Sequence, residues 1–241
     1  MLADQHVVVI GGSSGMGMAI ARAADSAGAR VVIAARDEAK LARAAARIGE
    51  RVTSVRLDIT DERAVAAFFE ATAPIDHLVV TAHASSVVTG AIDTLANMST
   101  AAARAFMETK FWGPFTVAKH GQRKLTPHGS IVLFSGAAGV RKLLPHHTAI
   151  GATNGAVEAF ARQLAKEIAP KRVNVIAAGL VRTPAYDGLS EEARDRMYAD
   201  YARTSLVGRV GRPEDIAEAA LYLMSNTYVT GQVHEIDGGR P

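Results

Sequence analysis

Short runs of β-branched and other apolar residues recur along the chain, separated by longer stretches rich in alanine. The runs have the length of buried strands and lack the polar alternation of a strand with one solvent-facing side. We predict strands at HVVVI (6–10), RVVIA (30–34), VTSVRL (52–57), DHLVVT (76–81), SIVLF (130–134), VNVIA (173–177) and QVHEI (232–236).

The alanine-rich stretches repeat apolar residues at spacings of three and four, which is the period of an amphipathic helix. We predict helices over 15–27, 37–48, 61–72, 99–125, 150–169 and 213–224. Strands that alternate with helices favour an α/β fold, a doubly wound parallel sheet of about seven strands with helices on both faces. No low-complexity linker or charge run divides the chain, so we expect residues 1–241 to form a single domain.

Composition excludes several classes of function. The 241 residues include no Cys, which rules out disulfides, thiolate metal sites and a cysteine nucleophile. The 27 basic and 24 acidic residues give a net charge of only +3 and are interspersed, so we expect no nucleic-acid partner. The N-terminus has no secretion-signal pattern, and no apolar run approaches the roughly 20 residues of a membrane span. We therefore expect a cytoplasmic protein with no membrane partner.

The first predicted strand is followed by the glycine-rich sequence Gly-Gly-Ser-Ser-Gly-Met-Gly (11–17) and then by a helix. This order directs backbone N–H groups and the positive end of a helix at a pyrophosphate, and side chains larger than glycine would block its approach. A tight turn without a ligand is the alternative. On the nucleotide interpretation, the binding residues are Gly11, Ser13, Ser14, Gly15, Met16 and Gly17.

The spacing of these glycines, GGxxGxG, resembles that of the short-chain dehydrogenase/reductase family, and the resemblance continues along nearly the whole chain. Asp58-Ile59 matches the family's adenine-contacting segment, and Thr81-Ala82-His83 lies at the family's Asn-Asn-Ala-Gly position. Ala-Gly-Leu-Val-Arg-Thr-Pro (178–184) resembles the segment whose threonine contacts the nicotinamide amide, which implicates Gly179, Val181 and Thr183. Segments 208–217 and 230–239 resemble the family's C-terminal signatures.

The resemblance implies a Rossmann-type fold, a nicotinamide dinucleotide and a small-molecule substrate. It also implies a homo-oligomer, a tetramer or dimer, assembled through 99–125, 150–169 and the C-terminal segment. Residues 183–206 correspond to the family's mobile lid over the substrate. A tyrosine from this lid could enter the site, although an amphipathic helix that packs its aromatic side chains inward is the interpretation we favour.

Cofactor choice follows from charge at the end of the second strand. NAD-binding relatives usually place an acid there for the adenosine ribose. Here the position is Ala35, and Arg36 follows. A guanidinium can pair with a 2′-phosphate and gains little from a neutral hydroxyl, so we predict NADP(H) in preference to NAD(H). An arginine stacked on the adenine, or simply solvated, is the alternative.

The catalytic positions of the family are all changed. Its Tyr-x-x-x-Lys becomes Ile150 and Asn154, its polarising serine becomes Gly136, and its asparagine becomes Lys110. An isoleucine cannot donate a proton, and a positioned acid typically contributes roughly 10²–10⁴-fold to a rate. Carbonyl reduction by the usual mechanism is therefore not expected.

Three residues are candidates to replace the lost chemistry. Lys110 could reach the nicotinamide ribose or donate a proton, or it could be a helix lysine that extends to solvent. His147 could serve as an acid, although a loop or helix-start histidine is the simpler interpretation. Ser135 precedes the changed serine position and would point to the other side of its strand. His83 could lie near the cofactor ribose or have a packing role. No third ligand accompanies these histidines, so we predict no metal.

Three functions remain open at this point. The first is an NADP(H)-dependent oxidoreductase with a rearranged acid, acting on an iminium or activated alkene whose proton demand differs. The second is an NADP(H)-binding sensor or partner subunit without turnover. The third is a non-redox enzyme that keeps the nucleotide as structure. We favour the first, partly by analogy with the family.

Overall fold

A seven-stranded parallel sheet runs through the middle of the protein, in a computed structural model that describes residues 2–82 and 89–240. The strands follow the order β3-β2-β1-β4-β5-β6-β7, and each pairs in parallel with its neighbour. Their bounds are β1 His6–Ile10, β2 Arg30–Ala35, β3 Val52–Arg56, β4 Ile75–Val80, β5 Leu125–Gly136, β6 Arg172–Ala178 and β7 Val233–Ile236. The doubly wound α/β prediction is confirmed.

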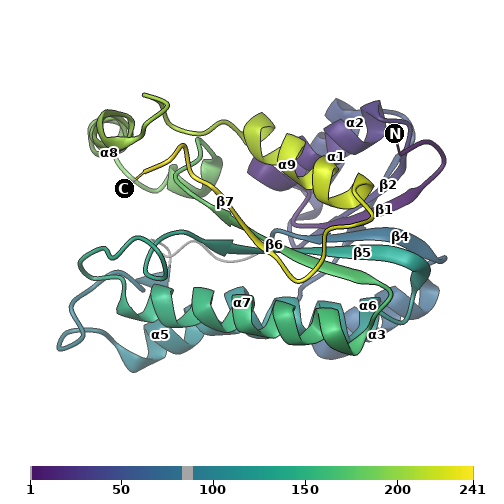
Figure 1. Cartoon of the computed structure of the whole chain (residues 1–241). Helices are drawn as coiled ribbons and strands as arrows, with labels where there is room; N and C mark the ends of the chain where they lie inside the picture. The colour runs from purple at the N-terminus through teal and green to yellow at the C-terminus, as the bar shows by residue number, and fades with distance from the viewer. Residues whose placement is uncertain (1, 83–88, 241) are drawn as a thin grey trace.

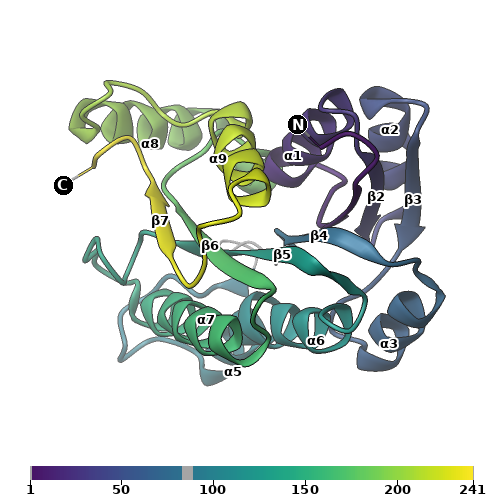
Figure 2. The ribbon, with the colours of Figure 1, turned by 45° about the vertical axis from the view of Figure 1, so that its right-hand side comes forward.

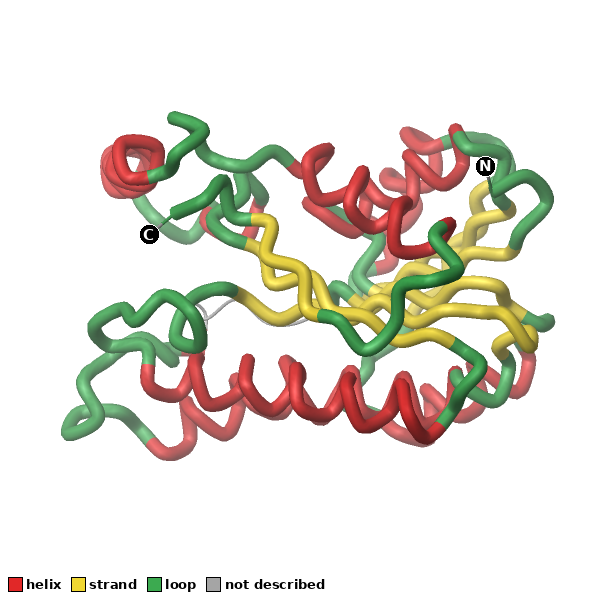
Figure 3. Tube along the Cα trace, in the orientation of Figure 1, coloured by secondary structure: helices red, strands yellow, loops and turns green. Residues whose placement is uncertain are grey.

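Helices cover both faces of this sheet (Figure 1, Figure 3). The views in Figures 1 and 2 place α1, α2 and α9 on one face and α3, α5, α6 and α7 on the other. Their bounds are α1 Gly15–Ser26, α2 Glu38–Ile48, α3 Glu62–Ala71, α5 Thr100–Met107, α6 Gly113–Gly121, α7 Thr148–Glu167, α8 Glu191–Thr204 and α9 Pro213–Ser225.

Two apolar layers hold the helices against the sheet, because the parallel strands are buried on both faces. Val7 and Val9 of β1 belong to the layer under α1, α2 and α9, whereas Val8 and Ile10 belong to the opposite layer. This alternation follows from the period of two along a strand. The alanines predicted to lie in the helices allow close packing; Ala19, Ala21 and Ala24 of α1 are all buried.

The predicted helix over 99–125 differs from the structure in two respects. Residues Glu108–Trp112 form a π-helical turn, η1, between α5 and α6, and the helical stretch ends at Gly121. A π turn inserts an extra residue into the helix and changes the direction of the side chains on it. The change matters because Lys110 lies within this turn and is buried.

None of the described helices combines the length and the apolar character that a bilayer crossing requires.

Candidate active site

The glycine-rich turn after β1 forms one wall of a pocket at the carboxyl ends of the strands. Gly11 has a φ of +96°, and a Cβ there would lie 2.5 Å from the Thr81 hydroxyl. A Cβ at Gly17 would overlap the Gly11 carbonyl oxygen. Only glycine therefore allows the turn to pass this close to β4 and to α1.

The N-terminus of α1 faces this pocket without a capping side chain. Ser14 is its N-cap residue but makes no side-chain capping hydrogen bond, and the first turn carries no acid. By contrast, α2, α3, α5 and α8 are each capped by an Asp or Ser side chain. Uncapped N–H groups and the positive end of the helix dipole together favour an anion at this point.

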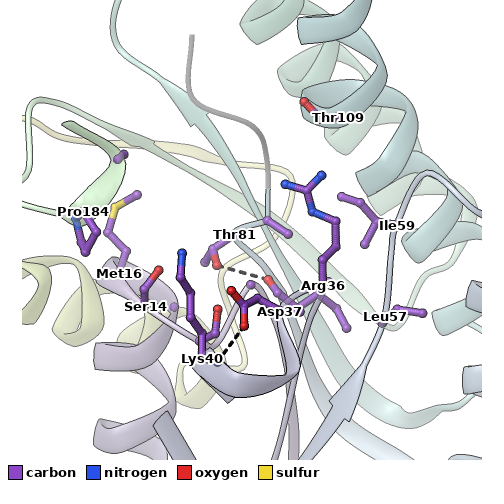
Figure 4. A pocket seen from close by; sticks show the side chains of 18 of the residues that line it. Ser14, Met16, Arg36, Asp37, Lys40, Leu57, Ile59, Thr81, Thr109 and Pro184 are labelled. Carbon is purple, nitrogen blue, oxygen red and sulfur yellow. Dashed lines mark hydrogen bonds between the residues drawn. The ribbon is translucent and has the colours of Figure 1, made fainter. Parts of the chain in front are cut away.

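Two cations extend into the pocket from the segment after β2 (Figure 4). Arg36 and Lys40 line it and lie on either side of Asp37. The Asp37 carboxylate accepts a hydrogen bond from the Lys40 backbone N–H at 2.9 Å, which caps α2. Both cations are exposed and remain available to an anionic ligand. Lys40 was not among the cofactor-binding residues predicted from the sequence. Its position one turn after the helix-capping Asp37 was the feature that could have indicated it.

The segment after β3 adds Asp58 and Ile59 to the lining of the pocket. The Asp58 carboxylate accepts hydrogen bonds from the backbone and hydroxyl of Thr60 at 3.0 and 2.8 Å. Partial burial opposes ionisation of Asp58, but these hydrogen bonds and the charges of Arg36 and Arg56 outweigh it and hold its pKa below the usual value.

The remaining predicted cofactor residues divide into two groups. Thr81, Ala82 and Thr183 line the pocket. Gly179 and Val181 do not line it. Gly179 lies against Tyr201 and Asp237, and Val181 is buried and bridges to Gly211. Both precede Thr183 in the same segment, so their positions favour a supporting role.

These residues fit a nicotinamide dinucleotide on structural grounds. The glycine turn leaves open space where a Cβ would intrude, and the uncapped end of α1 suits the pyrophosphate. Arg36 and Lys40 add positive charge to the lining of the same pocket, and β2 ends at Ala35.

Lys110 lies outside that pocket, buried beside the end of β5. Its ammonium donates a hydrogen bond to the Ser135 carbonyl oxygen at 3.5 Å. Burial lowers the pKa of Lys110 to about 8. The alternative of a helix lysine that extends to solvent does not hold, since only 6% of the residue is exposed.

Ser135 is engaged in a different interaction. Its hydroxyl donates to the buried Glu158 carboxylate of α7 at 2.9 Å. Arg141 donates two hydrogen bonds to the same carboxylate, at 2.6 and 2.8 Å. The hydrogen bond to Glu158 holds the Ser135 hydroxyl in place. This favours a structural role for Ser135 over a catalytic one.

Ile150 and Asn154 of α7 lie where the family resemblance places its tyrosine and lysine. Ile150 packs against Ala91 and Phe106 in a small apolar cluster. Asn154 donates to the Ala138 carbonyl oxygen at 3.0 Å, and its own side-chain oxygen is buried without a hydrogen-bond partner. A Cβ at Gly136 would lie 3.1 Å from the Asn154 amide nitrogen. Lys110 and Asn154 thus flank the same Ser135–Gly136 peptide.

His147 is the N-cap residue of α7, and its Nδ1 lies 2.7 Å from the Pro145 carbonyl oxygen. This geometry suits an Nδ1–H donor. The structure does not bring His147 into contact with Lys110 or with the pocket lining. His83 lies outside the described residues. Within the described part of the chain, no three His, Asp or Glu side chains gather as a metal site would require.

The tyrosines of the predicted lid are packed inward. Tyr198 and Tyr201 of α8 are buried with Val210, and the Tyr201 hydroxyl donates to the Asp237 carbonyl oxygen at 2.7 Å. Burial raises the pKa of Tyr186 to about 12. The inward-packing interpretation agrees with this arrangement, in which none of these three tyrosines lines the pocket.

Comparison with known proteins agrees with this architecture. A family model described as enoyl-(acyl carrier protein) reductase matches residues 11–240. The short-chain dehydrogenase/reductase ATR9 of Stachybotrys chlorohalonatus is 33% identical over 98% of this chain and 96% of its own. The inactive 2-(S)-hydroxypropyl-CoM dehydrogenase 2 of Xanthobacter autotrophicus is 35% identical over 91% and 98% of the two chains.

Solved structures lead to the same family. A small-chain dehydrogenase in complex with NADPH superposes with a TM-score of 0.84, at 36% identity, over 98% of both chains. A short chain dehydrogenase/reductase family protein superposes with a TM-score of 0.86, at 28% identity, over 99% of this chain and 97% of its own. From its sequence, its fold and the arrangement of its glycine-rich pocket, the chain belongs to the short-chain dehydrogenase/reductase family.

Proposed function

We propose that this protein is an NADP(H)-dependent oxidoreductase that transfers hydride to or from a small organic substrate without the family's tyrosine acid. The pair of cations in the pocket carries the proposal. Arg36 and Lys40 extend into the same pocket as the glycine-rich turn, and Ala35 presents no carboxylate there. The NADPH in the solved small-chain dehydrogenase supports the same cofactor.

The residues of the pocket would bind and orient the dinucleotide in an extended form. The glycine-rich turn and the α1 N-terminus would bind the pyrophosphate. Arg36 and Lys40 would bind the 2′-phosphate, and Asp58 with Ile59 would contact the adenine. Thr183 lies at the end of the pocket that the family resemblance assigns to the nicotinamide. The bound nicotinamide would supply or accept the hydride.

Lys110 is the proposed proton donor, in preference to the two other candidates. The Ser135 hydroxyl already donates to Glu158, and the His147 ring nitrogen lies against a backbone carbonyl. A lysine whose pKa is about 8 is protonated in most molecules at neutral pH, yet loses its proton far more readily than an exposed lysine. Substrates such as an iminium, which need no proton on hydride transfer, would depend less on this residue.

The test mixes the NADPH complex with a panel of ketones, imines and enones and follows nicotinamide absorbance. We expect oxidation of NADPH with at least one imine or enone, and slow or no oxidation with simple ketones. Lys110→Ala should slow turnover of substrates that need a proton, whereas Lys166→Ala on the exposed face of α7 should not. Absence of NADPH binding would contradict the proposal outright.

A second candidate is an NADP(H)-binding protein without turnover. It is favoured by Gly136 and Ile150, which place no proton-donating group where the family has a serine and a tyrosine. The relative from Xanthobacter autotrophicus is itself described as inactive. Tight NADPH binding with no oxidation across the whole panel would support this candidate over the first.

The homo-oligomeric state, the cytoplasmic location and the single-domain organisation over residues 1–241 are parts of the same proposal. The homo-oligomeric state has support in a cluster of aromatic side chains from η1, α6 and α7. There Phe111, Trp112, Phe115 and Phe160 form a chain of ring contacts with centroids 4.9 to 6.2 Å apart. Trp112 is 47% exposed, which is unusual for a tryptophan on the surface of a monomer.

A further inference from the structure

Four cationic side chains follow one another along one exposed side of α2. Arg36 precedes the helix, and Lys40, Arg43 and Arg47 lie on it; all four are exposed. An α-helix turns by about 100° per residue, so the three helical cations lie within about 60° of one another on a single face. We call these four residues the cationic stripe.

The cationic stripe begins in the cofactor pocket and leads away from it. Arg36 and Lys40 line the pocket (Figure 4), whereas Arg43 and Arg47 do not. With a rise of about 1.5 Å per residue, Arg43 and Arg47 lie about 4.5 and about 10.5 Å beyond Lys40 along the helix axis. Their side chains lean toward the N-terminus of α2, which is the end at the pocket. These spacings are comparable with the Debye length of about 8 Å at physiological ionic strength, so both charges act on an anion that approaches the pocket.

No acid among the described residues lies within ion-pair distance of the cationic stripe. The arginines of α8 differ in this respect. Arg194, Arg196 and Arg203 each pair with an acid, at distances of 2.8 to 3.5 Å. The charges on α2 are therefore left free to act on a ligand, while those on α8 are used within the protein.

The acids nearest in sequence to the cationic stripe are otherwise placed. Asp37 caps α2 by accepting the Lys40 backbone N–H at 2.9 Å. Glu38 is exposed and lies about 160° around the helix from Lys40. Glu50 follows the C-cap residue Gly49 and is exposed. None of these three acids pairs with a cation of the stripe.

Cations at the pocket end already influence a group inside the pocket. Burial of Asp58 raises its pKa, but hydrogen bonds from Thr60 and the charges of Arg36 and Arg56 hold that pKa below the usual value. Arg56 is itself exposed, and its Nε donates to the Arg36 carbonyl oxygen at 3.4 Å. The field of exposed cations thus extends into the pocket.

We propose that Arg43 and Arg47 steer NADP(H) toward its site, acting on the phosphates of the dinucleotide before contacts form. A ligand that meets α2 would be drawn along the cationic stripe toward Lys40 and Arg36, which speeds association without adding contacts to the bound state. Arg43 and Arg47 then set the rate of capture, whereas Arg36 and Lys40 hold the bound 2′-phosphate. The inference rests on the proposed function, because it takes NADP(H) as the ligand.

The experiment measures the association and dissociation rate constants of NADPH by stopped-flow fluorescence, from about 0.01 M to about 1 M salt. Arg43→Gln with Arg47→Gln should lower the association rate constant about three- to tenfold at the lowest salt and leave the dissociation rate constant unchanged. At about 1 M salt the Debye length is about 3 Å, so the difference should fall below about twofold.

The matched control is Arg162→Gln with Lys166→Gln. These two cations are also exposed and four residues apart, but they lie on α7, on the opposite face of the sheet from α2 (Figure 1). Both double variants remove two positive charges, so the control separates the local field of α2 from the net charge of the protein. Its association rate constant should stay close to that of the unaltered protein.

Two further comparisons separate charge from contact. Arg43→Lys with Arg47→Lys keeps both charges and should keep the fast association. NADH lacks the 2′-phosphate and should be slowed less than NADPH by the glutamine variant. The preference for NADPH should remain in that variant, because Arg36 and Lys40 still bind the 2′-phosphate.

Three results would overturn the inference: an unchanged association rate constant in the α2 glutamine variant at low salt, an equal fall in the α7 control, or a faster dissociation in place of a slower association. Glutamine favours helices and both positions are exposed; should the double variant still fail to fold, each single glutamine variant must show a smaller fall. Absence of NADPH binding to the unaltered protein would reject the proposed function as well, whereas NADPH that binds at equal rates rejects this inference alone.

Discussion

Lys110 is the residue at which folding and proposed function conflict. Its buried ammonium has one long hydrogen bond and no carboxylate partner among the described residues. Burying an uncompensated charge costs free energy, and a protein with no use for the amine would gain stability from an apolar side chain here. The free-energy cost of burying Lys110 can therefore be measured by replacing it with an apolar residue.

Lys110→Met should stabilise the protein at about pH 7. The folded-state pKa of about 8 lies below the ordinary lysine value of 10.5, a difference worth about 3 kcal/mol while the amine is protonated in both states. Between these two values the unfolded chain binds more protons, so the stability of the unaltered protein rises with pH there. The Met variant should lack this rise.

Urea unfolding at about pH 7 and about pH 10 checks this, with the exposed Lys166→Met as control. A Met variant less stable than the unaltered protein at the lower pH would mean that Lys110 has a partner that offsets its burial.

At the scale of elements, the end of β5, the π turn η1 and the start of α7 meet around the Ser135–Gly136 peptide. A serine at position 136 would crowd Asn154, because its Cβ would lie 3.1 Å from the amide nitrogen. A lysine at position 154 would bring a second ammonium to the peptide that Lys110 contacts, and two like charges repel each other. Positions 110, 136 and 154 therefore depend on one another, and they should be exchanged together with position 150.

A variant with Lys110→Asn, Gly136→Ser, Ile150→Tyr and Asn154→Lys should gain NADPH-dependent ketone reduction. Its matched control carries Ile150→Phe in place of Ile150→Tyr and lacks only the phenol hydroxyl. We expect the tyrosine version to be faster by about 10²-fold or more, the usual contribution of a positioned acid. Equal rates in the two versions would show that α7 does not present position 150 to a substrate.

Sequence patterns predicted these elements unevenly, for physical reasons. Strands such as HVVVI, which is β1 in full, could be read because burial on both faces demands an unbroken apolar run. The π turn could not, since 99–125 keeps a helical pattern throughout and the inserted residue leaves no mark on it. The link from Arg141 through Glu158 to Ser135 joins residues 17 and 23 positions apart on different elements, and no periodic pattern marks it, so only the folded structure reveals it.

The whole molecule contains a second buried base, at the opposite end of the sheet from the pocket. His77 of β4 contacts the Ser130 hydroxyl at 2.8 Å and the Gln5 side-chain oxygen at 2.9 Å. Burial, aided by the charge of Arg172, lowers the pKa of His77 to about 4. The folded protein thus keeps this imidazole neutral where the unfolded chain would bind a proton.

Acidification should therefore destabilise the fold through His77. Its contribution is fully present above the ordinary histidine pKa of 6.5 and is lost as the pH falls toward about 4, with a total effect of about 3 kcal/mol. His77→Gln should flatten this part of the stability curve, whereas the exposed His128→Gln should not. Denaturant midpoints measured across this range test it; an equally steep loss in His77→Gln would assign the acid sensitivity to other groups.

The aromatic cluster of Phe111, Trp112, Phe115 and Phe160 should determine whether the protein forms a homo-oligomer. Trp112→Glu places a charge on the exposed member of that cluster and should shift the mass measured by light scattering toward a smaller species. Leu143→Glu, at an 86% exposed apolar residue in the loop before α7, is the control. An unchanged mass in Trp112→Glu would exclude this face as an interface.

The most direct test of the account is calorimetric titration of the protein with NADPH and with NADH. We predict that NADPH binds at least about tenfold more tightly, because a charge-assisted pair with the 2′-phosphate is worth about 1.5–3 kcal/mol. Arg36→Ala and Lys40→Met should each reduce that preference, whereas Arg43→Ala on the same helix α2 should preserve it. Equal affinity for the two cofactors, or a preference that survives loss of both cations, would contradict the proposed NADP(H) site.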